Sequence, residues 1–137
     1  MTQPAQPKQR HIALILARDF AASLVIPMFV VDSDGDLVYY NEAAEALLGR
    51  PYAEAQMSAD EWARAFRPVD VDGSPVPPEE LPLSVAFMTG APTHRGLRIE
   101  GGDGVERDIE VTAFPLVAQQ GQLVGSVAVF WERPPGG

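Results

Sequence analysis

The first clear pattern in the chain is a pair of short hydrophobic runs, Met28–Val31 and Leu37–Tyr40. Both runs are rich in Val, Phe and Tyr, which favour strands because they pack well on a pleated surface. The segment between them, Asp32–Asp36, is acidic and contains a glycine that can adopt a positive φ at low cost. This succession of apolar run, turn and apolar run predicts a β-hairpin.

A short helix is predicted directly after the hairpin. Asn41 precedes the residues Glu42–Leu48, and asparagine is a preferred N-cap because its side-chain oxygen accepts a hydrogen bond from a free backbone N–H. Gly49 follows, and glycine suits the left-handed residue after a helix. The stretch that ends at Gly49 is therefore expected to be strand, turn, strand and capped helix.

A longer helix is predicted before the hairpin, over residues 11–25. Its apolar residues recur at helical spacing but cover more of the circumference than one buried stripe requires. They are Ile12, Leu14, Ile15, Leu16, Ala17, Phe20, Ala21 and Leu24. Two interpretations stay open: the helix packs only on its own sheet, or it also meets a second copy of the chain.

Two more helices are predicted in the middle of the chain. One carries Trp62 and Phe66, which are four residues apart and share a face. The other is Leu81–Thr89, where the only proline falls in the first turn, the position at which a helix tolerates it. Leu83 and Phe87 share a face of this second helix.

Three further strands complete the chain. They are Thr93–Glu100, Val105–Phe114 and Leu123–Trp131. The second alternates apolar and polar residues with a period of two, which is typical of a strand with one buried face. The third is apolar almost throughout, which is expected of a central strand covered on both faces.

This order of elements resembles that of a PAS domain. The resemblance rests on the DSDGD turn at 32–36, Asn41, the helix closed by Gly49, the segment Pro82–Gly90 and the glycine-rich link Gly101–Gly104. It implies an α+β fold: a five-stranded antiparallel sheet with short helices on one face and an N-terminal flanking helix.

The resemblance also divides the chain into segments. We expect a flexible tail at 1–10, an amphipathic flanking helix at 11–25, the PAS-like domain at 26–132 and a second flexible tail at 133–137. Proline and glycine in that last segment are incompatible with a signalling helix. We therefore expect no output domain, and a signal that leaves through a partner bound in trans.

Composition narrows the function. The chain of 137 residues has 19 acidic and 10 basic residues, a net charge of −9, which disfavours nucleic-acid binding. No apolar run approaches the roughly 18 residues of a membrane span, and the N-terminus lacks the pattern of a signal peptide. A soluble cytoplasmic protein that binds neither nucleic acid nor membrane is expected.

Candidate catalytic groups are few. The chain has no cysteine and only two histidines, His11 and His94. A Ser-His-Asp triad would have to combine His94 with Ser58, Ser74, Ser84 or Ser126, and no nucleophile-elbow motif surrounds any of these serines. We therefore expect a protein that is not an enzyme.

The acidic turn and the glycine-rich link both have simpler explanations than ligand binding. Counted from Asp32, an EF-hand loop needs Gly at its sixth position and Glu at its twelfth, where this chain has Leu37 and Ala43. The turn is therefore expected to be a solvated acidic turn without a metal. No Lys-Ser/Thr pair on a helix follows Gly101–Gly104, so this link is expected to be a hairpin turn rather than a phosphate site.

The resemblance implies a ligand cavity between the sheet and the helices, bordered by the helix Leu81–Thr89. The candidate apolar pocket residues are Trp62, Phe66, Leu83, Phe87, Leu97 and Ile99. Arg95 and Arg98 could contact an anionic ligand there, although arginines on strands are usually solvated. The alternative is that the six apolar residues form an ordinary filled core.

The identity of a cofactor stays open. By the resemblance, haem is disfavoured because the helix Leu81–Thr89 has no histidine. Flavin or another chromophore attached through cysteine is disfavoured because the chain has no cysteine. Non-covalent flavin remains compatible with the sequence.

The function expected from these features is a sensory or signalling module that binds a small apolar molecule, a protein partner or both. A homodimer through the N-terminal helix is the predicted assembly. The alternative is a ligand-free adaptor that acts by dimerisation, and a small α+β enzyme is the least favoured reading.

Overall fold

The computed structural model describes residues 12–49, 57–101 and 104–133. Its helices and strands are α1 (Ile12–Ala22), β1 (Met28–Asp32), β2 (Leu37–Tyr40), α2 (Glu42–Leu48), α3 (Ala59–Phe66), the 3-10 helix η1 (Pro78–Glu80), α4 (Pro82–Thr89), β3 (Thr93–Glu100), β4 (Glu106–Val117), the 3-10 helix η2 (Gln119–Gly121) and β5 (Leu123–Glu132). The predicted tail at 1–10 lies outside the described residues, as does the tail predicted at 133–137 except for Arg133, whose N–H donates to the Asp108 carbonyl over 2.8 Å. No helix in the described ranges is long and apolar enough to cross a membrane.

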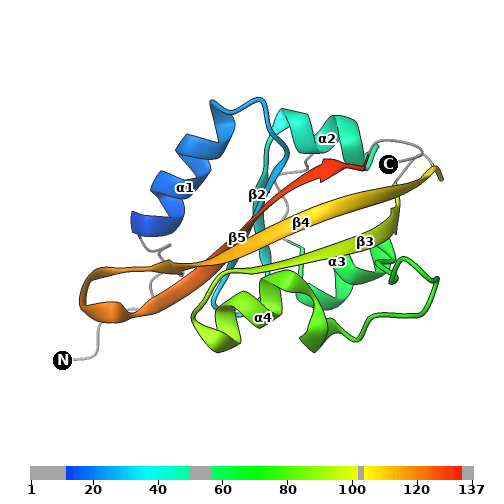
Figure 1. Cartoon of the computed structure of the whole chain (residues 1–137). Helices are drawn as coiled ribbons and strands as arrows, with labels where there is room; N and C mark the ends of the chain where they lie inside the picture. Colours follow the sequence, from blue (N-terminus) through cyan, green and yellow to red (C-terminus); the bar gives the residue numbers. More distant parts are fainter. Residues whose placement is uncertain (1–11, 50–56, 102–103, 134–137) are drawn as a thin grey trace.

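The five strands form one antiparallel sheet in the order β2-β1-β5-β4-β3 (Figure 1). β5 is the middle strand, as its apolar sequence predicts. β4 continues to Val117, past the predicted end at Phe114. This extension accommodates Pro115 because the pairing of β3 with β4 stops at Ala113, so one edge of β4 is free of that strand. The predicted α+β fold is confirmed.

Helices cover both faces of the sheet, and α1 and α4 lie on opposite sides of it (Figure 1). Successive side chains of a strand point to opposite faces. On β1, Phe29 and Val31 therefore join the larger core with α2, α3 and α4, whereas Met28 and Val30 join a smaller core with α1. All five residues of β1 are buried, because this strand is covered on both sides.

The helix α1 packs on the sheet through a narrow part of its surface. Leu14 and Ala17 are buried against the smaller core, and the guanidinium of Arg18 lies 5.1 Å from the ring centroid of Tyr39. Four large apolar residues instead face away from the sheet, with exposed fractions of 66% for Ile12, 47% for Ile15, 60% for Leu16 and 59% for Phe20. The helix ends at Ala22, where the Ser23 hydroxyl donates to the Phe20 carbonyl over 2.8 Å.

The side chain of Asn41 connects three segments. Its Oδ1 accepts hydrogen bonds from the Ala44 N–H at 3.0 Å, as the predicted N-cap, and from the Met28 N–H at 3.1 Å. Its Nδ2 donates to the Ile26 carbonyl over 2.8 Å. Asn41 is 1% exposed, so these bonds replace water for a buried amide and join the start of β1 to the start of α2.

Truncation of this amide should destabilise the fold. Asn41→Ala removes the helix cap and leaves the Met28 N–H and the Ile26 carbonyl without their side-chain partner. We expect the free energy of unfolding, measured by urea titration, to fall by about 2–4 kcal/mol.

Ser58→Ala is the matched control for that change. Ser58 also caps a helix, and its hydroxyl accepts from the Glu61 N–H at 3.2 Å. Its loss should cost about 0.5–1 kcal/mol, the ordinary value of a cap. Equal losses in the two variants would show that Asn41 is no more than a helix cap.

Candidate functional site

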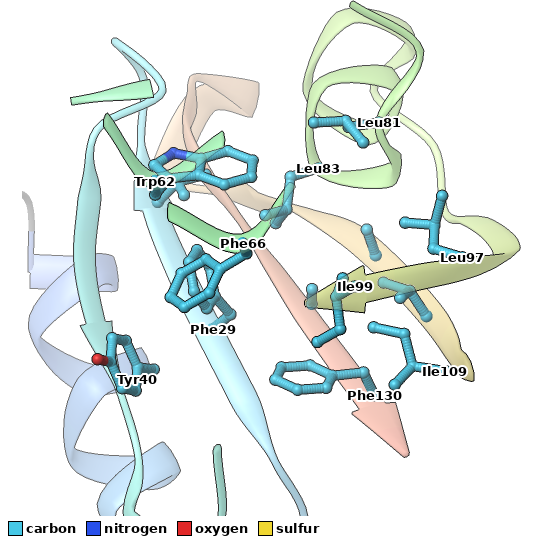
Figure 2. Close-up of a cluster of buried hydrophobic side chains, with 14 of the residues drawn as sticks. Phe29, Tyr40, Trp62, Phe66, Leu81, Leu83, Leu97, Ile99, Ile109 and Phe130 are labelled. Atoms are coloured by element: carbon cyan, nitrogen blue, oxygen red, sulfur yellow. The ribbon is translucent and has the colours of Figure 1, made fainter. Parts of the chain in front are cut away.

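An apolar cavity of about 70 Å³ lies between the sheet and the helices α2–α4. Figure 2 shows Leu97, Ile99 and Ile109 facing the rings of Phe29 and Phe66 across the core. The cavity is lined by Phe29, Leu48, Trp62, Phe66, Pro68, Leu81, Pro82, Leu83, Leu97, Ile99, Ile109, Val111, Ala128 and Phe130. Every described residue in this lining is apolar or aromatic. The cavity therefore offers contacts to a hydrocarbon or a gas and none to a charged group.

Aromatic rings form one wall of this cavity. The Phe29 ring stacks on Tyr40 with centroids 5.7 Å apart, and it meets Trp62 and Phe66 edge-on at 5.5 and 6.1 Å. The one polar atom of Trp62, Nε1, donates to the Gly35 carbonyl over 3.0 Å. This bond anchors the indole to the β1–β2 turn and leaves its hydrocarbon surface for the cavity.

The volume limits the size of a ligand. An apolar cavity of roughly 150 Å³ stays dry and binds benzene or xenon. A cavity half that size accommodates a xenon atom or a hydrocarbon of a few carbons. In this form it is too small to enclose a flavin or haem ring system.

Five of the six predicted pocket residues come together around the cavity: Trp62, Phe66, Leu83, Leu97 and Ile99. Phe87 does not line it. Leu83 and Phe87 share a face of α4 as predicted, but only Leu83, in the first turn, reaches the cavity. Phe87, one turn later, borders a separate groove together with Leu83.

This groove has a volume of about 360 Å³. It lies between the β1–β2 turn, η1 and α4, and it is lined by Val31, Asp32, Ser33, Asp34, Gly35, Trp62, Pro78, Glu79, Leu83, Ser84, Phe87, Met88 and Ser126. Trp62 and Leu83 line both the groove and the cavity, so these two side chains stand between the two spaces.

The two predicted arginines are engaged away from the cavity. Arg98 alternates with Leu97 and Ile99 and therefore points to the other face, where its Nε donates to Asp108 Oδ1 over 2.8 Å. Arg95 lies near the edge of the sheet and donates to Asp70 Oδ2 over 3.0 Å. Neither side chain contributes to the cavity lining.

The candidate catalytic residues are held apart. His94 Nδ1 lies 2.7 Å from Thr112 Oγ1, and His94 Nε2 lies 2.8 Å from Glu110 Oε2. The Ser126 hydroxyl is fully buried and donates to the Leu83 carbonyl over 3.0 Å. Both ring nitrogens of His94 are thus engaged by residues of β4, and neither by a serine.

The acidic turn is less solvated than its sequence predicts. Asp32 is buried, and its Oδ1 accepts hydrogen bonds from the Asp34 N–H at 2.9 Å and the Asp36 N–H at 3.1 Å. One carboxylate oxygen from each of the three aspartates lies within 4.8 Å of the others. The backbone bonds to Asp32 account for its burial, since N–H donors stabilise a carboxylate removed from water.

The sequence did not predict a polar cluster on the outer face of the sheet, which is the face on which α1 packs. Glu110 contacts both His94 and Arg133, and the Arg133 Nε donates to Glu110 Oε1 over 2.9 Å. The Trp131 ring lies 6.0 Å from the His94 ring. The register of β3 against β4 brings His94 beside Glu110, and the register of β4 against β5, which pairs Glu110 with Trp131, brings Trp131 and Arg133 there.

Glu110 should make stability depend on pH. The hydrogen bond from Arg133 is the main cause that lowers the pKa of Glu110 below its ordinary 4.5, and the bond from His94 adds to it. A lowered pKa in the folded state stabilises the protein above the ordinary pKa, and this contribution is lost as the pH falls below it. The stability difference between wild type and Glu110→Gln should therefore shrink in acid.

Arg133→Gln is the control for this effect in the same urea titrations. It removes the main cause of the shift and should abolish most of the same pH dependence. If the free energies of unfolding of wild type and Glu110→Gln differ by the same amount from neutral pH into acid, Glu110 is not the group that makes stability depend on pH.

Comparisons with known proteins identify the family to which this fold belongs. Residues 21–133 match the family described as PAS fold. None of the curated proteins matches the chain. The PAS domain of a protein from Colwellia psychrerythraea is similar in structure, with a TM-score of 0.60 and 18% identity over 88% of this chain and 96% of that one.

Two further solved structures share the fold. The PAS domain of nitrogen regulation protein NR(II) from Vibrio parahaemolyticus has a TM-score of 0.60 and 18% identity over 86% of this chain and 98% of its own. An RNA-binding light-oxygen-voltage receptor has a TM-score of 0.65 and 23% identity over 96% of this chain and 37% of its own. Because the family match spans most of its length, the chain belongs to the PAS fold family.

Proposed function

We propose that this PAS domain is a sensory signalling module that takes up a small apolar ligand in its inner cavity. The observation that carries the proposal is a void of about 70 Å³, with apolar walls, inside an otherwise buried core. Protein interiors are close-packed, and voids larger than a water molecule are few. A filled core would favour the alternative, a ligand-free adaptor.

We propose that the domain senses rather than catalyses. The described residues of the cavity wall include no acid, base or nucleophile. His94 is bonded to Thr112 and Glu110 on the outer face of the sheet, whereas Ser126 is buried beside α4. These groups do not converge on a space in which a substrate could react.

The cavity can be tested with xenon as an apolar probe. Xenon should shift the methyl NMR signals of Leu97, Ile99 and Ile109 in a saturable way, because these side chains line the cavity. Ala128→Val adds two carbons to the lining from the central strand and should abolish the shifts. Its stability should fall by less than the roughly 1–3 kcal/mol that added carbons cost in a filled core, since they enter a void.

Ala46→Val is the matched control, because Ala46 is exposed on α2 and the shifts should remain. The ligand proposal would be wrong if xenon leaves the methyl signals of the wild type unshifted. It would also be wrong if the shifts persist in Ala128→Val. Native mass spectrometry of the purified protein then separates the two functions: a retained small molecule supports the sensor, and a ligand-free mass supports the adaptor.

We further propose that α1 pairs with α1 of a second copy. Ile12, Ile15, Leu16 and Phe20 face away from the sheet, although burial of one such side chain is worth about 1.5–3 kcal/mol. A two-fold pairing of this face would be self-complementary, as in most homo-oligomers. The net charge of −9 opposes association only over about 10 Å in ordinary salt.

Leu16→Glu should shift the protein toward monomer in sedimentation, because a charge would be buried in the paired face. Val105→Glu is the matched control: Val105 is similarly exposed, at 49%, and precedes β4 at the end of that strand opposite Leu116, which packs with α1. A wild-type chain that stays monomeric at high micromolar concentration would exclude the homodimer and leave this face to a different protein.

A further inference from the structure

The outer groove has the size of a ligand site in its own right. Its volume of about 360 Å³ falls within the range of about 300–1,000 Å³ typical of small-molecule pockets. It reaches the surface beside Met88, which is 72% exposed, and it shares only Trp62 and Leu83 with the described lining of the apolar cavity. The groove is therefore a candidate ligand site separate from the cavity.

Most of the groove wall is hydrocarbon. α4 supplies Leu83, Phe87 and Met88, η1 supplies Pro78, and Trp62 closes the inner end. Bare metal ions gain nothing from such walls, whereas an organic ligand with a ring or a branched alkyl body does. Asp32 and Asp34 of the turn, which also line the groove, do not by themselves define the site, because the apolar wall is its larger part.

The charged groups of the groove have one sign. Asp34 stands on the β1–β2 turn and Glu79 on η1, and both are exposed. Among the described residues that line the groove there is no lysine, arginine or histidine, and the chain as a whole carries a charge of −9. An anionic ligand would be repelled here, whereas a cation would be attracted from both sides.

We propose that this groove binds a small organic cation with an apolar body, such as an aromatic or branched-alkyl amine. The ammonium group would lie toward Glu79 and Asp34, and the hydrocarbon would pack on Phe87 and Met88. This site goes beyond the proposed sensing of an apolar molecule in the inner cavity, and either one can exist without the other.

The test is an NMR titration of the full chain with phenethylammonium and with phenethyl alcohol, its neutral counterpart. The amine should shift the amide signals of Gly35, Ser84 and Met88, which line the groove, and leave the cavity methyls unchanged. The alcohol should bind at least about fivefold more weakly. Raising the salt concentration should weaken the amine alone, because the charges are exposed.

Two variants assign the contacts. Glu79→Gln should weaken amine binding about three- to fivefold, the usual range for one exposed charge pair. Phe87→Leu keeps an apolar side chain on α4 but removes the ring, and it should weaken the amine and the alcohol alike. Glu132→Gln is the control, because Glu132 is an exposed carboxylate at the end of β5 that does not line the groove.

Three results would overturn the proposal. One is equal affinity for the amine and the alcohol, which would make the groove a purely apolar site. Another is an affinity unchanged by both Glu79→Gln and Phe87→Leu. The third is that calcium displaces the amine and that Phe87→Leu leaves the affinity for the amine unchanged. This result would show that the site is a metal site on the turn.

Discussion

The fold depends on one buried amide, that of Asn41. Its oxygen and nitrogen face different backbone groups, and only a side chain with both an acceptor and a donor can satisfy the Met28 N–H and the Ile26 carbonyl together. The same oxygen begins α2 by accepting from Ala44. One residue thus closes the open end of the β1–β2 hairpin and sets the direction of the helix that follows. Both the hairpin and α2 carry side chains of the cavity wall, so the hydrogen bonds of Asn41 help to set the shape of the cavity.

The sheet has two cores because its middle strands are covered on both faces. On one face the covering helices have only seven or eight residues, and they meet over the sheet without filling the space between them. On the other face a single helix covers β1 and β5 and keeps an apolar surface turned outward. Phe29 and Val30 are neighbours on β1 but belong to different cores. A displacement of β1 on the cavity side is therefore felt directly beneath α1, since packed side chains transmit strain.

The sequence by itself determined the parts of this protein that rest on local interactions. The β1–β2 hairpin, the cap at Asn41 and the left-handed Gly49 with a φ of 65° all involve partners close in the chain. The central place of β5 also followed from the sequence, because an uninterrupted apolar run can be covered only from both sides. The apolar character of the pocket followed for the same reason: helix spacing placed Trp62 and Phe66 on one face, and strand alternation did so for Leu97 and Ile99.

Only the tertiary structure decided which of several equivalent surfaces is used. The apolar residues of α1 were evident in the sequence, but the way the helix packs on the sheet buries Leu14 and Ala17 and leaves Leu16 exposed. The register of β3 against β4 decides that His94 meets Glu110 rather than a serine. Gly125 lies within a strand rather than in a turn. Glycine is required there because a Cβ would lie 2.2 Å from the Val31 carbonyl oxygen. These outcomes depend on distances between segments far apart in the chain, and local propensity carries no information about such distances.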